Sequence, residues 1–238
     1  MAPEAAPVKQ CPGGMKYGRE EVQAGIFDTL VADAAARGLL DKISDAEFEA
    51  SLARILDGLP ADRDVWVFAY GSLLWNPTFD FVEQRVAVLE GWHRSFCMWT
   101  PVGRGTPERP GLTLGLDRGG ACIGVAFRIA AEVRERELTL LWRREMLVHA
   151  YEARWVELRC GRETLPAITM TMDPTSKLYA AGLEPEAIAR TLATAAGELG
   201  SARDYLENTV SHLRELGFAD RGLRVLLARV RALATDDA

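Results

Sequence analysis

The stretch VWVFAYGSLLWNP, residues 65–77, decides the fold of this chain. Its apolar run from Val65 to Tyr70 predicts a buried β-strand, which Gly71-Ser72 ends abruptly. Glycine permits a backbone turn that other residues resist, and it leaves peptide N–H groups open to a docked group. A strand that ends in this way can cradle a carboxylate or an oxyanion. A plain Gly-Ser turn that closes a hairpin is the alternative.

Further strands and helices follow from hydrophobic periodicity and from Gly and Pro punctuation. The additional strands are expected at residues 85–91, 94–99, 112–117, 121–129, 154–160 and 164–172. The helices are expected at residues 20–38, 45–57, 131–146, 185–196, 202–216 and 220–234. Because strands and helices do not alternate regularly, a doubly wound parallel sheet is disfavoured. The pattern predicts an α+β protein with a small antiparallel, barrel-like β-sheet, a crossing helix and flanking helices.

The chain divides by composition into three parts. Residues 1–18 are rich in Ala, Pro and Gly and are expected to be a disordered tail. Residues 19–60 predict a helical extension, with Val22, Ile26, Leu30 and Val31 at helical spacing in its first helix. Residues 61–238 are expected to form the main domain.

Composition excludes several classes of function. The 238 residues carry a net charge of −6, which argues against binding to a nucleic-acid backbone. The four cysteines and three histidines match no disulfide framework or metal-ligand spacing, so no metal is expected. Without a signal pattern or an apolar run long enough to cross a bilayer, the protein is expected to be soluble, cytoplasmic and not bound to a membrane.

A carboxylate lies on the apolar face of the helix predicted at residues 131–146. Leu138, Leu141 and Trp142 mark that face by their three- and four-residue spacing, and Glu145 continues it. The two arginines before it, residues 143–144, are expected to point away. A buried carboxylate must be paired, or have a raised pKa, or act chemically, and a pKa near neutrality suits a general base. The alternative is a helix that ends early, with Glu145 in solvent or paired to one of these arginines.

Other polar residues are weaker candidates for a site. Cys97 with His93 resembles a thiol nucleophile and its base, but no third partner is apparent, and a buried structural cysteine is favoured. The Gly- and Pro-rich stretch from Arg104 to Arg109 could meet an anionic substrate or form an ordinary surface loop.

Taken together, four segments resemble the ChaC family of γ-glutamylcyclotransferases, in its glutathione-specific branch. VFAYGSLLWNP (67–77) resembles the Y-G-S-L substrate loop of that family, and IGVAFRI (123–129) resembles its G-V-A-Y-R strand. LWRREM (141–146) resembles the helix with the catalytic Glu, which falls on Glu145. GELGSARDYL (197–206) resembles the Gly-rich segment before a helix that begins with Tyr-Leu. The likeness covers roughly residues 65–217 and leaves the role of the first 60 residues open.

The resemblance implies an enzyme that cleaves glutathione into 5-oxoproline and cysteinylglycine without consuming water. In that reaction the α-amine of the substrate attacks its own γ-carbonyl carbon, Glu145 is the general base, and the Tyr70–Leu73 loop binds the substrate. No metal or organic cofactor is implied. The substrate-binding residues implied by the motif are Val67, Phe68, Ala69, Tyr70, Gly71, Ser72 and Leu73.

Two other functions stay open at this point. The protein could be a cyclotransferase for other γ-glutamyl amino acids or amines, or a non-catalytic regulatory protein of the same fold. A serine hydrolase that uses Ser72 is disfavoured, because no G-x-S-x-G elbow surrounds this residue.

Overall fold

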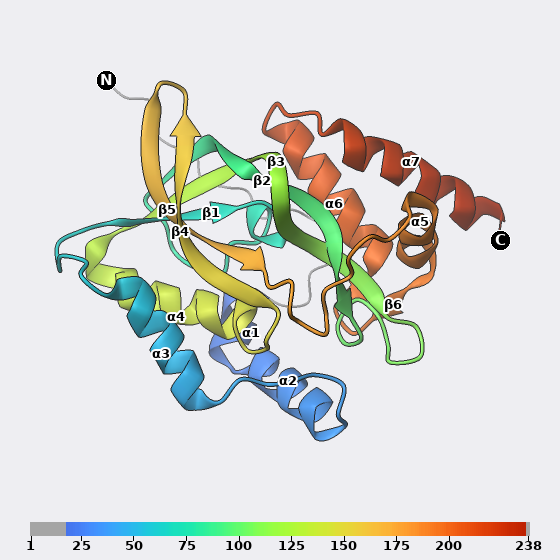
Figure 1. Cartoon of the computed structure of the whole chain (residues 1–238), viewed down its shortest axis with the longest axis horizontal. Helices are drawn as coiled ribbons and strands as arrows, with labels where there is room; N and C mark the ends of the chain where they lie inside the picture. Colours follow the sequence, from blue (N-terminus) through green and yellow to red (C-terminus); the bar gives the residue numbers. More distant parts are fainter. Residues whose placement is uncertain (1–17, 237–238) are drawn as a thin grey trace.

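The computed structural model describes residues 18–236, and within them five strands close into a barrel (Figure 1). In chain order these strands are β1 (Val65–Ala69), β2 (Glu83–Thr100), β3 (Gly111–Ile129), β4 (Tyr151–Cys160) and β5 (Glu163–Met172). The order around the barrel is β1-β3-β2-β4-β5, and parallel pairing of β1 with β5 closes it, with Val67 opposite Ile168. The predicted α+β class with a barrel-like sheet is confirmed. The tail expected at residues 1–18 falls, apart from its last residue, outside the described part of the chain.

Strand β1 is buried on both faces, which explains its unbroken apolar sequence. Trp66 and Phe68 belong to a cluster with members from all five strands, which places their side chains inside the barrel. Val65 and Val67 belong to the larger cluster, which includes Leu138 and other helix residues. The side chains of β1 therefore alternate between the barrel interior and the helix layer.

Strands β2 and β3 are longer than the sequence predicts. Residues 85–91 and 94–99 form one strand rather than two, and so do residues 112–117 and 121–129. Gly91 does not end a strand but has a positive φ of 78° where the register shifts between Glu90 and Trp92. The glycine therefore marks a β-bulge within a long bent strand, not a turn between two strands.

Four helices cover one side of the barrel (Figure 1). Three of them precede β1 in the chain, and the fourth follows β3. The first three are α1 (Arg19–Gln23), α2 (Ile26–Ala36) and α3 (Asp45–Leu56), and the crossing helix is α4 (Arg134–Glu145), which follows β3 after the 3-10 helix η2 (Ala131–Val133). The single helix predicted for residues 20–38 is divided at Gly25, which has a left-handed conformation. Helices α1, α2 and α3 all pack on α4, so the N-terminal segment, residues 19–60, rests on the crossing helix.

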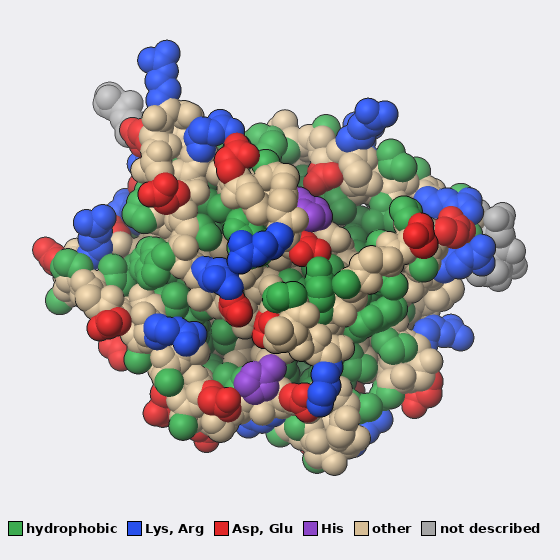
Figure 2. Space-filling model, viewed as in Figure 1, with side chains coloured by type: hydrophobic (Ala, Val, Ile, Leu, Met, Phe, Trp, Pro, Cys, Tyr) green, Lys and Arg blue, Asp and Glu red, His purple; other side chains and the backbone are tan. Residues whose placement is uncertain are grey.

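Three C-terminal helices pack together on the other side of the barrel, in orange and red in Figure 1. They are α5 (Pro185–Thr194), α6 (Ala202–Glu215) and α7 (Arg221–Asp236), and the short strands β6 (Ala196–Gly197) and β7 (Gly200–Ser201) precede α6. Ser201 caps α6 by accepting a hydrogen bond from the Asp204 N–H at 2.9 Å. On the face shown in Figure 2, basic and acidic side chains are interspersed. Among the described residues, no helix is long and apolar enough to cross a membrane.

Candidate active site

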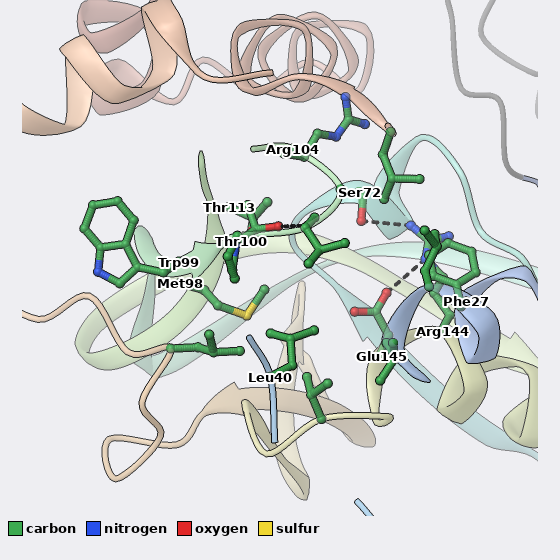
Figure 3. A pocket seen from close by; sticks show the side chains of 18 of the residues that line it. Phe27, Leu40, Ser72, Met98, Trp99, Thr100, Arg104, Thr113, Arg144 and Glu145 are labelled. Carbon is green, nitrogen blue, oxygen red and sulfur yellow. Dashed lines mark hydrogen bonds and ion pairs between the residues drawn. The ribbon is translucent and has the colours of Figure 1, made fainter. Parts of the chain in front are cut away.

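A cavity of about 210 Å³ brings together the two main features that the sequence singles out. It is lined by Ser72, in the turn after β1, and by Glu145, the last residue of α4 (Figure 3). The turn is formed by the 3-10 helix η1 (Ser72–Leu74), so the apolar strand leads the chain directly into the cavity wall. The turn at the end of β1 therefore brings backbone N–H groups into the same cavity as the carboxylate at the end of α4.

Glu145 is largely buried and paired with a neighbouring arginine. Its side chain is 18% exposed, and its Oε1 lies 3.0 Å from the Nε of Arg144, whose side chain is 5% exposed. Burial raises the pKa of Glu145, and the positive charge of Arg144 opposes that rise. The expectation that Arg144 points away from the apolar face is wrong, because its buried side chain lines the same cavity as Glu145.

Arg144 also connects the carboxylate to the turn after β1. Its guanidinium donates to the Ser72 Oγ at 2.8 Å and to the Asn76 carbonyl oxygen. One buried cation thus fixes the relative positions of Glu145 and η1. The pairing anticipated as the alternative to a functional role is present, but it lies inside the cavity and not on the solvent face of the helix.

The charge of Glu145 affects the pKa values of three buried tyrosines. Burial raises the pKa of Tyr70 and of Tyr151 well above the usual value, and the negative charge of Glu145 adds to both shifts. Burial also raises the pKa of Tyr205 to about 12, with Glu145 again contributing. The phenols therefore stay neutral near the carboxylate, and Tyr151 donates to the Leu114 carbonyl oxygen at 3.3 Å.

The residues of the predicted substrate loop differ in their access to the cavity. Of the seven predicted residues, only Ser72 belongs to the cavity lining; the other six, residues 67–71 and 73, are buried and do not line it. Gly71 lies against Tyr205, since a Cβ on Gly71 would be 2.8 Å from the Tyr205 hydroxyl oxygen. Any larger residue at this position would force the Tyr205 side chain to shift.

The Gly-rich loop after β2 contributes a buried cation. Arg104 is 6% exposed and lines the cavity, where its guanidinium lies 5.5 Å from the centre of the Tyr205 ring and donates to the Ser201 carbonyl oxygen. Burial lowers the pKa of Arg104. Arg109, at the other end of the stretch, is exposed. One end of the stretch thus reaches the cavity, where it could meet an anionic substrate, and the other end is an ordinary surface loop.

The thiol alternative finds no matching arrangement. Burial raises the pKa of Cys97 to about 12, so its thiol stays protonated and is a poor nucleophile. The His93 ring nitrogen Nδ1 lies 3.1 Å from the carbonyl oxygen of Gly119. Across residues 18–236, no group of three or more His, Cys, Asp or Glu side chains is placed to hold a metal ion.

Several cavity-lining residues are not predicted as site residues from the sequence. Arg144 and Tyr151 flank the predicted carboxylate along the chain, but spacing on a helix or strand does not show that both turn inward at its end. Phe27 and Leu40, from the N-terminal segment, also line the cavity (Figure 3). An apolar helical stripe signals burial against some surface, and only the tertiary structure shows that this surface is a cavity.

The comparisons with known proteins agree with this architecture. Residues 65–233 match the model of the ChaC-like protein family. The chain belongs to the ChaC family. This ChaC protein is 43% identical over 190 residues to the glutathione-specific gamma-glutamylcyclotransferase of Escherichia coli, covering 79% of this chain and 82% of that protein. It is 36% identical over 155 residues to gamma-glutamylcyclotransferase 2-1 of Arabidopsis thaliana, covering 60% of this chain and 70% of that one. A crystal structure of a yeast cyclotransferase specific to glutathione shares the fold, with a TM-score of 0.67, 19% identity, and coverage of 71% of this chain and 96% of that one.

Proposed function

We propose that this ChaC protein cleaves glutathione by intramolecular cyclisation, giving 5-oxoproline and cysteinylglycine. The observation that carries the proposal is the buried carboxylate of Glu145, held beside the turn after β1 in one cavity. The identity to the Escherichia coli enzyme supports glutathione as the substrate. Holding the γ-glutamyl chain folded supplies much of the rate, because oriented intramolecular reactions reach effective molarities of about 10⁵–10⁸ M.

Glu145 is the proposed general base. The α-ammonium group of the substrate loses a proton to this carboxylate, and the free amine attacks the γ-carbonyl carbon to form a new C–N bond. When the amide C–N bond to cysteine breaks, Glu145 returns the proton to the departing nitrogen. The released amine takes up the second proton, which the new ring nitrogen loses, so no water is consumed. The raised pKa of Glu145 makes it a stronger base than a solvated carboxylate. Its salt bridge with Arg144 keeps it ionised and oriented.

The turn after β1 is the proposed oxyanion site. The first N–H groups of η1, those of Ser72 and Leu73, precede the hydrogen bonds of that helix and are not used within it. Backbone donors aimed at the developing oxyanion are typically worth about 3–4 kcal/mol each. In this scheme Ser72 binds and orients through its backbone and through Arg144, and its hydroxyl is not a nucleophile.

The products of the reaction test the function directly. Purified protein incubated with millimolar glutathione is expected to yield 5-oxoproline and cysteinylglycine in equal amounts, measured by mass spectrometry. Release of glutamate would indicate hydrolysis, and intact glutathione would contradict the proposed substrate. A parallel incubation with γ-glutamyl-alanine distinguishes a glutathione-specific enzyme from one that accepts γ-glutamyl amino acids in general.

Removal of the base tests the role of Glu145. The substitution Glu145→Gln keeps the shape of the side chain but cannot accept the proton, so kcat is expected to fall by at least ~10². Glu135→Gln is the matched control, because Glu135 is exposed on the same helix and is expected to leave kcat unchanged. Near-normal turnover by Glu145→Gln would show that another group is the base.

A further inference from the structure

Four apolar side chains from the N-terminal segment line the same cavity as Ser72 and Glu145. Phe27, Leu30 and Val31 lie three and four residues apart on one face of α2, and Leu40 follows the helix. All four precede residue 65, where the match to the ChaC family begins. The region that matches the family model therefore lacks these four side chains of the cavity lining.

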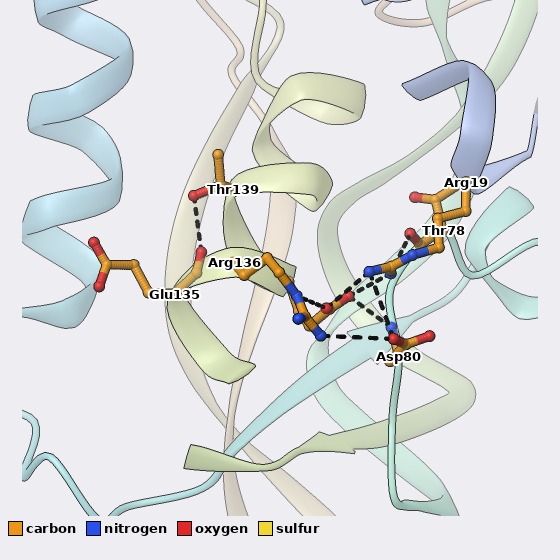
Figure 4. A network of polar contacts seen from close by, with 7 residues as sticks. Arg19, Thr78, Asp80, Glu135, Arg136 and Thr139 are labelled. Carbon is orange, nitrogen blue, oxygen red and sulfur yellow. Dashed lines mark hydrogen bonds and ion pairs between the residues drawn. The ribbon is translucent and has the colours of Figure 1, made fainter. Parts of the chain in front are cut away.

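Both ends of this part of the chain are attached to α4 or to the segment just after it. At the N-terminal end, the Arg19 guanidinium donates to both oxygens of Glu137 on α4, at 2.5 Å and 2.9 Å (Figure 4). At the other end, the Ile43 N–H donates to the Leu147 carbonyl oxygen at 3.1 Å. Glu137 is fully buried, and α2 lies between the two attachments. The four cavity-lining side chains are therefore fixed in position relative to α4, the helix with Glu145.

The cavity that these four side chains help to line is small. Met98, Trp99 and Val102, from β2 and the loop after it, line the same cavity. The volume of about 210 Å³ lies below the roughly 300–1,000 Å³ that is usual for small-molecule sites. A tripeptide in this space has little room beside it, so the size of the wall residues decides which substituents fit.

The chemistry of the wall limits what can lie against it. Phe27, Leu30, Val31 and Leu40 offer no side-chain hydrogen-bond donor or acceptor, and a carboxylate or ammonium group placed there would lose its water without a partner. The charged groups of the substrate are better matched by Arg104, Arg144 and Glu145. A thiol behaves as a small hydrophobic group, so the cysteine side chain of glutathione suits the wall.

We propose that Phe27, Leu30, Val31 and Leu40 form a specificity wall, against which the side chain of the second residue of the γ-glutamyl peptide packs. This inference rests on the proposed function and adds a selection rule to it. The wall accepts a free thiol and excludes substituents on the sulfur, so S-alkylated glutathione is a poor substrate. Reducing a wall side chain opens space for the alkyl group.

A specificity ratio tests the wall. For the full-length protein and its variants, kcat/KM is measured with glutathione and with S-propylglutathione, with 5-oxoproline as the common product. Phe27→Ala is expected to raise the ratio of S-propylglutathione to glutathione by about tenfold or more, the scale set by one methylene group in an apolar pocket. Ile26→Ala is the matched control, because Ile26 precedes Phe27 on α2 and is not among the cavity-lining residues. Its ratio is expected to equal that of the wild type.

A second, milder variant guards against loss of folding. Val31→Ala removes less volume and is expected to shift the ratio in the same direction by a smaller factor. An unchanged ratio in both wall variants would overturn the inference while leaving the proposed function intact, and so would wild-type protein that cleaves both substrates equally. Wild-type protein that neither binds nor cleaves glutathione would overturn both.

Discussion

Arg144 and Glu145 are neighbours at the end of α4, and their side chains form a salt bridge inside the cavity. Burial raises the pKa of Glu145, and Arg144 lowers it. A general base must be ionised, so kcat/KM for glutathione is expected to rise with pH as Glu145 loses its proton, at a pKa above the usual 4.5.

The arginine sets where that rise occurs. In Arg144→Met the opposing charge is gone while burial remains, so the acidic limb of the pH–rate profile is expected to move to higher pH. Arg143→Met removes the same charge from an exposed position on the same helix and is expected to leave the limb in place. The position of the limb, not the height of the profile, is the readout. An unmoved limb in Arg144→Met would show that Glu145 does not control the profile.

The contact between Gly71 and Tyr205 gives a second prediction for single residues. A methyl group on Gly71 would lie 2.8 Å from the Tyr205 hydroxyl oxygen, and the Tyr205 ring is held edge-on by Trp75 and Phe96. Gly71→Ala is therefore expected to destabilise the protein by about 1–3 kcal/mol, measured by urea unfolding. Removing the hydroxyl in Gly71→Ala/Tyr205→Phe is expected to recover part of that loss, and strictly additive penalties would contradict the contact.

Among the helices, the attachment of α1 to α4 rests on one buried carboxylate. Burial alone would raise the pKa of Glu137, but hydrogen bonds from Arg19, the Asp80 N–H and Arg136 outweigh it and lower the pKa to about 2. A depressed carboxyl pKa stabilises the folded state above the unfolded value near 4.5, and this contribution is lost as pH falls toward 2.

Arg19→Met tests this attachment. It is expected to lower the free energy of unfolding by about 2 kcal/mol at pH 7, since a buried charge loses a charged hydrogen-bond partner. The difference from the wild type is expected to shrink as Glu137 takes up a proton at acidic pH. Arg136→Met is the control: the Arg136 side chain is 60% exposed, so its loss is expected to cost less than about 1 kcal/mol. Equal losses in the two variants would place the attachment elsewhere.

Long-range pairing explains where the prediction of the elements from sequence succeeds and fails. The run before Gly71 identifies β1, because a strand buried on both faces has a local apolar signature. Gly91 has the same local signature whether it closes a turn or forms a bulge, and only pairing of Glu90 and Trp92 with β3 decides between them. The two long strands were therefore predicted as four short ones.

The site shows the same division between local and tertiary information. Helical spacing is enough to place Glu145 on an apolar face, and the motif around Ser72 is contiguous in the chain. The spacing of Leu30 and Val31 correctly indicates an apolar face of a helix, but it does not distinguish a core from a cavity. That distinction depends on β2 and its loop, some 70 residues further along the chain.

On the scale of the whole molecule, the cavity exists because segments that are far apart in the chain meet. The N-terminal segment, the turn after β1, the end of β2 with its loop, and the end of α4 each supply part of the lining. Tyr205 adds a contribution from the C-terminal helices. A bound substrate that touches all of these segments would link the two helical layers through the end of the barrel.

Ligand binding should therefore stabilise segments that are far apart in sequence. In Glu145→Gln, which keeps the cavity but turns over slowly, glutathione at 100 times its Kd is expected to add about 2.7 kcal/mol to stability. For a chain of this size that corresponds to a rise in Tm of roughly 5–10 °C. Hydrogen exchange is expected to slow together in residues 27–40, 71–75 and 98–104, while the far end of the β4–β5 hairpin, residues 157–166, serves as the unaffected reference. Protection of residues 71–75 without residues 27–40 would mean that glutathione occupies the turn after β1 but does not reach the specificity wall, which separates the two proposals in one measurement.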